Sequence, residues 1–145
     1  MKIPEYITIT EVKKVCKELG LRDWTALKKP QVTLKEARAI LAALEVKTPD
    51  FDIEDLRQGL EVELEHGVMY PDSNVTNNHP LLTGKIVLAH FKESLDYYKR
   101  LEVAEIEGDM LKAAAAGNAA KLQEKYRKLV KAKLALSQGE TTRMK

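Results

Sequence analysis

Cysteine is almost absent from this sequence of 145 residues, and other features that define whole classes of protein are missing too. Cys16 is the single cysteine, so no disulfide can form within the chain. Its apolar neighbours at helical spacing predict a buried, inert thiol. No run approaches about 18 consecutive apolar residues, and the first thirty residues lack the apolar core of a signal peptide. We therefore expect a cytoplasmic protein without a membrane span.

Motifs for nucleophilic and phosphate chemistry are missing as well. The chain has seven glycines, and they form neither a Gly-x-Ser-x-Gly elbow nor a glycine-rich phosphate loop. Acid–base chemistry by His66 or His90 with a glutamate partner stays open. These observations favour a protein that is not an enzyme.

Aromatic residues make up 6% of the chain, whereas leucine, alanine, lysine and glutamate dominate it. These four residues are strong helix formers, because they lose little side-chain freedom in a helix. A hydrophobic content of 44% at this length is enough for one domain with a core. We predict an all-α fold, a compact bundle of five to six helices, with a single domain over residues 1–137 and a frayed tail over 138–145.

Capping patterns mark where the helices begin. Thr8 and Thr33 are each followed three residues later by glutamate, as in a capping box, and Asp52 is a third cap. These caps predict three short helices, ending near Leu19 before Gly20, near Val46, and near His66 at Gly67.

The second half of the sequence predicts two longer helices. Pro80 suits the first position of a helix, because the amide that proline lacks would be unpaired there. This central helix, apolar on most of its circumference, should reach about Leu101. A basic helix should follow over residues 104–137, with a break at Gly117 and Asn118.

Four runs of sequence in the middle of the chain share an order with a known family. They are Gly59 to Gly67, Asn74 to Asn77, Pro80 to Phe91 and Asp96 to Tyr98. Together, over about residues 51–101, they resemble the domain of unknown function 5661 family. The resemblance implies a protein of bacteria, archaea or phages, and it brings no established activity. Where the family pattern leads us to expect acidic residues, this chain has Asn78 and His79.

Two histidines and two glutamates in this segment could converge. A helix advances about 100° per residue, so Glu63 and His66 share one flank of the third helix, and His90 and Glu93 share a face of the next. If the helices pack antiparallel, the pairs could meet and bind a divalent metal, because imidazole and carboxylate groups on facing helices form such sites. One Glu-x-x-His motif and its reverse favour a single ion. The alternative is a structural network in which the side chains satisfy one another.

The polar loop between these helices holds a second set of candidates. Asn74, Thr76, Asn77 and His79 could bind a ligand, but they are also typical turn and capping residues. We favour the capping role for this loop.

Charge is distributed unevenly along the chain. Residues 1–50 carry 10 basic and 7 acidic groups (+3), residues 51–107 carry 5 and 12 (−7), and residues 108–145 carry 9 and 3 (+6). The last helix should expose a basic surface formed by Lys121, Lys125, Arg127, Lys128, Lys131 and Lys133.

These features lead to three function hypotheses, and the segregation of charge motivates the first. The first is an interaction or accessory protein that binds a protein partner or itself through the acidic and basic surfaces. The second is a metal-binding protein or small metal-dependent enzyme that uses Glu63, His66, His90 and Glu93. The third is nucleic-acid binding through the basic helix.

Overall fold

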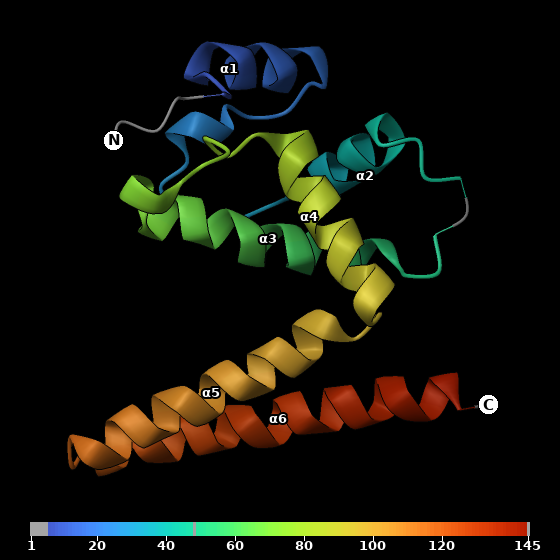
Figure 1. Cartoon of the computed structure of the whole chain (residues 1–145). Coiled ribbons are helices and arrows are strands. Elements are labelled where there is room, and N and C mark those ends of the chain that lie inside the picture. The colour runs from blue at the N-terminus through green and yellow to red at the C-terminus, as the bar shows by residue number, and fades with distance from the viewer. Residues whose placement is uncertain (1–5, 48, 145) are drawn as a thin grey trace. The chain divides into compact units, whose positions relative to one another are not determined.

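The computed structural model describes residues 6–47 and 49–144, and within them it contains six α-helices and no strand. The helices are α1 (Ile9–Glu18), α2 (Leu34–Ala43), α3 (Ile53–Met69), α4 (Pro80–Glu93), α5 (Tyr97–Ala115) and α6 (Ala119–Arg143) (Figure 1). Two 3-10 turns, η1 (Trp24–Ala26) and η2 (Pro71–Ser73), lie between them. The all-α prediction is confirmed, and no helix among these residues is long and apolar enough to cross a bilayer.

Local chemistry places the helix starts where the sequence predicts them. Thr8, Thr33 and Asp52 each accept a hydrogen bond from the backbone amide three residues later. At Thr33 the full capping box forms, because Glu36 also accepts from the Thr33 amide at 2.9 Å. Pro80 opens α4.

Contacts divide the chain into two compact units, Met1–Leu95 and Asp96–Lys145. In the first unit α3 packs on α4 and α2, α2 also packs on α4, and α1 contacts η1 and α4. Its core includes the single tryptophan, Trp24, with aliphatic residues from all four helices: Val12, Ile40, Leu56, Leu60, Leu64 and Val87. The predicted single domain over residues 1–137 stays a prediction.

The second unit is a hairpin of α5 and α6, which pack side by side (Figure 1). Gly117, with φ of +64°, makes the turn, and Asn118 caps α6 by accepting a hydrogen bond from the Lys121 amide. The predicted break at these two residues is therefore confirmed. The hairpin's core cluster is small, with Ile106, Leu129 and Ala132 buried.

Several predicted helix boundaries are wrong. Helix α2 ends at Ala43, not near Val46. Helix α3 does not end at Gly67 but continues to Met69. The predicted helix from Pro80 to Leu101 is two helices, because Ser94 has an extended backbone (φ −161°, ψ 132°) that ends α4.

The predicted frayed tail over 138–145 is helical as far as Arg143. Two ion pairs hold this end of α6 on the start of α5. The 2%-exposed carboxylate of Asp96 binds Arg143 at 2.6 Å and Arg100 at 2.9 Å, and Arg100 also binds Glu140 at 2.6 Å. The carboxylate of Asp96 is thus shared by the first turn of α5 and the last turn of α6.

Candidate functional site

The four candidate metal ligands lie in one row across the first unit. Glu63 is at the centre: its two carboxylate oxygens lie 3.8 Å from Nδ1 of His66 and 3.6 Å from Nε2 of His90. The other ring nitrogen of His90, Nδ1, lies 3.3 Å from Glu93. The positions of these residues along α3 and α4 therefore bring their side chains together, as their spacing in the sequence predicts.

The row differs from a metal centre in how its donor atoms are directed. The ring nitrogens of His90 point in different directions, so Glu63 and Glu93 lie on opposite sides of the imidazole. No group of three or more His, Cys, Asp or Glu side chains in residues 6–47 and 49–144 is arranged to hold a metal ion. As placed, the row is a chain of imidazole–carboxylate contacts of 3.3 to 3.8 Å, and its metal-binding role stays a prediction.

Burial separates the inner members of the row from the outer ones. The side chains of Glu63 and His90 are 12% and 26% exposed, whereas those of His66 and Glu93 are 67% and 65% exposed. The outer two side chains can therefore change rotamer at little cost in packing.

The asparagines of the 70–79 loop tie distant segments together. The Asn74 amide donates to Asn78 Oδ1 at 2.9 Å and to the Gly67 carbonyl at 3.3 Å, and Thr76 contacts Asn74 at 3.5 Å. Asn77 donates to the carbonyl of Ile7 at 2.6 Å. These bonds give the candidate ligand-binding residues structural partners.

Asn78 and His79 complete this network from buried positions. The Asn78 amide donates to the Trp24 carbonyl at 3.3 Å, which links the loop to η1. His79 Nδ1 accepts from the amides of Leu81 and Leu82 and so caps α4. Burial lowers the pKa of His79, which keeps the imidazole neutral for this acceptor role. A ligand role for the loop stays a prediction.

The row and the loop border one hollow of about 400 Å³. Glu63 and His66 line it from α3, and Asn74 and Thr76 line it from the loop. Sequence reasoning missed its other lining side chains, Tyr70, Ser73, Val75 and Ile86. Tyr70 and Val75 are 57% and 86% exposed, and such large exposed apolar residues in a loop are a signal that the sequence offers.

The six basic residues predicted on the last helix divide into two groups of three. Lys125, Lys128 and Lys133 form ion pairs with Asp109, Glu124 and Glu107. Within the described residues the other three, Lys121, Arg127 and Lys131, have no ion pair. The carboxylates of α5 thus neutralise part of the basic surface, because two of the three pairs cross the hairpin.

An exposed apolar row accompanies Arg127 and Lys131 on α6. Tyr126, Val130 and Leu134 are 57%, 53% and 58% exposed. They repeat every four residues and form a ridge on the helix surface. The sequence did not separate this ridge from the buried residues Leu129 and Ala132, because both rows fit a helical period.

Comparison with known protein families places this all-α chain in one of them. The model of the family described as Protein of unknown function (DUF5661) matches residues 12–107, so the chain belongs to this family. The match extends beyond the 51–101 segment that carries the sequence motifs, and it leaves out all of α6. The comparisons with curated proteins and with solved structures found no match.

Proposed function

We propose that this chain is a non-enzymatic interaction protein that docks an acidic, amphipathic helix of another protein on the outer face of α6. The observation that carries the proposal is the ridge of Tyr126, Val130 and Leu134, beside which Arg127 and Lys131 form no ion pair within the described residues. A ridge of this spacing packs into the groove between side chains of a second helix.

The apolar surface continues beyond the ridge toward the tip of the hairpin. Leu122 extends the same four-residue row, and it lines a hollow of about 550 Å³ together with Met110 and Tyr126. Mostly apolar walls at the end of an exposed row offer a partner's side chain a place to anchor.

Charge selects the kind of partner. The flank of the ridge that carries Arg127 and Lys131 is basic, whereas Lys133 on the other flank is paired with Glu107. Two copies of α6 that brought their Arg127 flanks together would place cations against cations. Carboxylates on a partner helix would instead pair with Arg127 and Lys131. A partner of opposite charge therefore fits better than a second copy.

Two other polyanions fit less well. Nucleic acid offers phosphates to the cations but no apolar surface for the three exposed side chains of the ridge. A membrane would take up a broader apolar face than a ridge one residue wide.

The test uses two synthetic helical peptides with the same leucine seam, one flanked by glutamate and the other by lysine. Fluorescence anisotropy should give the glutamate peptide a Kd at least about tenfold lower, because only its flanks pair with the cations of α6. Val130→Glu, and separately Arg127→Glu with Lys131→Glu, should weaken binding by about the same factor. All three positions are exposed, so the fold should tolerate these changes.

Lys121→Glu is the matched control. It reverses one charge on the same helix, but Lys121 lies about 180° around α6 from Val130, and binding should change less than about twofold. Equal binding of the two peptides would contradict the proposal. Binding of duplex DNA or anionic vesicles that Val130→Glu leaves intact would assign the surface to those ligands instead. A dimer that Val130→Glu abolishes would assign it to a second copy.

A metal-binding role is the second candidate, and the position of Glu63 between two imidazoles favours it. Rotation of the exposed His66 side chain could direct a third donor toward the same point. Metal analysis of protein purified without a histidine tag, with Glu63→Gln and His90→Ala as variants, tests it. A divalent ion that both variants lose supports this role, and no ion above background in the wild-type protein ends it.

A further inference from the structure

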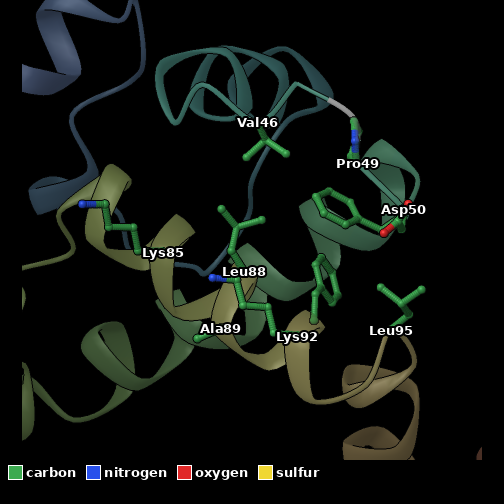
Figure 2. Close-up of a pocket in the computed structure, with 10 residues that line it drawn as sticks. Val46, Pro49, Asp50, Lys85, Leu88, Ala89, Lys92 and Leu95 are labelled. Carbon is green, nitrogen blue, oxygen red and sulfur yellow. The ribbon is translucent and has the colours of Figure 1, made fainter.

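An apolar groove of about 740 Å³ lies in the first unit, away from the row of histidines and glutamates (Figure 2). It runs between α4 and the segment that connects α2 to α3. Phe51 and Phe91 line it and pack against each other, with ring centroids 4.6 Å apart and planes inclined by 35°. Val46 from the connecting segment and Leu88 from α4 line it as well, together with Leu95, which follows α4. This size is within the range of about 300–1,000 Å³ for small-molecule sites.

Charged side chains are arranged asymmetrically around this groove. Lys85 and Lys92 come from α4, and Asp50 comes from the connecting segment (Figure 2). Both lysines are exposed and form no ion pair within the described residues. Two unpaired cations near an apolar surface attract an anion, whereas Asp50 disfavours a second negative group across the groove.

We infer that this groove is a binding site for a small apolar monoanion, namely a carboxylate with an aliphatic or aromatic body. The apolar body lies over the Phe51–Phe91 pair between Val46 and Leu88, and the carboxylate is placed at the α4 rim, within reach of Lys85 and Lys92. The lysine side chains contribute their methylene groups to the apolar wall and keep their ammonium groups in water.

The apolar surface and the two lysines lie in different parts of the groove. A ligand that fits must therefore combine an apolar body with a negatively charged end. An inorganic anion would leave the phenylalanine pair exposed to water, and an apolar cation would meet the two lysines. A long amphipathic helix needs anchors over several turns, whereas the α4 side of this groove extends only from Lys85 to Leu95, about three turns or fewer.

The experiment titrates the full chain with dodecanoate and with dodecyltrimethylammonium, both below their critical micelle concentrations. The two probes have straight alkyl tails of eleven and twelve carbons and differ in the sign of the head group. Calorimetry should give dodecanoate a Kd at least about tenfold lower, because only its head group is attracted to Lys85 and Lys92. Methyl NMR signals of Val46, Leu88 and Leu95 should shift on addition of dodecanoate.

Three variants distinguish this site from nonspecific binding of an amphiphile. Lys85→Glu with Lys92→Glu should reverse the preference between the two head groups. Ala89→Trp, at an exposed position that lines the groove, should weaken the binding of both probes because the indole ring fills the groove. Lys35→Glu, an exposed lysine on α2 that does not line the groove, should change neither affinity.

The fold of each variant is checked by its thermal midpoint in circular dichroism, so a loss of binding in an unfolded variant is recognised. Equal affinity for the two head groups, NMR shifts confined to other residues, or unchanged dodecanoate binding by the double lysine variant would overturn the inference. Binding of a glutamate-flanked peptide in the groove, with no binding of dodecanoate, would also overturn it.

Discussion

Glu36 is a residue with a local role that the sequence reveals and a long-range role that it does not. The Thr33-x-x-Glu36 pattern predicts the capping box, since both partners lie within one turn of helix. Arg22 and Trp24 also donate to this carboxylate, Arg22 at 2.6 and 2.9 Å and Trp24 Nε1 at 3.3 Å. These donors precede Glu36 by 14 and 12 residues, so only the tertiary fold, which places residues 22–24 beside the start of α2, brings them to it.

The charge state of Glu36 makes the first unit sensitive to acid. Burial by itself would raise the pKa of Glu36, but hydrogen bonds from Arg22, Thr33 and Trp24 outweigh it and lower the pKa from 4.5 to about 2. Because the pKa is lower in the folded state, this stabilisation is present above pH 4.5 and is lost as the pH falls toward 2.

Glu36→Gln should lower the free energy of unfolding at pH 7 by about 2–3 kcal/mol, because a neutral amide replaces the buried carboxylate that Arg22 binds. Between pH 5 and pH 2.5 the wild-type protein should lose about this amount, and the variant much less. Urea unfolding followed by the fluorescence of Trp24 measures both. Glu65→Gln, at an exposed position, is the control and should follow the wild type. An equal loss in Glu36→Gln and the wild type over this pH interval would show that another carboxyl group is responsible.

Individual helices could be predicted from the sequence wherever local chemistry determines them. Helices begin at Thr8, Thr33 and Asp52 because the side-chain oxygen of each residue accepts a hydrogen bond from the free amide three residues later. This interaction needs only residues that are close in sequence. Gly20 and Gly117 end helices with φ of +65° and +64°. Gly67 carries the same sequence signal, yet α3 passes through it.

The reason lies in tertiary packing around Gly67. A Cβ atom at this position would collide with Oδ1 of Asn78 and would lie 2.7 Å from Nδ2 of Asn74. Glycine is thus required because the asparagine side chains of the loop lie directly on the backbone of α3. A single sequence cannot distinguish this requirement from a helix end, since the asparagines follow Gly67 by 7 and 11 residues.

Gly67→Ala should therefore destabilise the protein by about 1–3 kcal/mol, because the new methyl group displaces Asn78 and breaks its bond to the Trp24 carbonyl. Gly108→Ala is the matched control within α5, where a Cβ atom meets nothing within 4 Å. That change should stabilise its helix by up to about 1 kcal/mol. Thermal unfolding measures both variants, and similar effects of the two would contradict the packing argument.

Across the whole molecule, the periodicity of the helices predicted one long-range contact, that of Glu63 with His90, but it did not predict the groove. Glu63 and His90 meet because both face the seam between α3 and α4, which follows from their positions along each helix. The groove over Phe51 and Phe91 could not be predicted in this way. It depends on how the segment between α2 and α3 returns to α4, and no periodic pattern encodes that path.

The division into two units leads to a prediction about cooperativity. The first unit buries large side chains from four helices, whereas the hairpin's core cluster is Ile106, Leu129 and Ala132. Stability follows buried apolar surface, so we expect the hairpin to unfold at a lower temperature than the first unit. Trp24, the single tryptophan, reports on the first unit alone, and helical circular dichroism reports on both.

Heating should give two transitions in circular dichroism, with the fluorescence of Trp24 following the second. Leu129→Ala removes a buried side chain of the hairpin and should lower the first midpoint, with the fluorescence transition unchanged. Leu60→Ala, which opens a cavity in the core of the first unit, is its counterpart and should lower the fluorescence transition. If the two signals instead coincide and each substitution shifts both, the units unfold as one cooperative domain, because the loss of either core then destabilises the other.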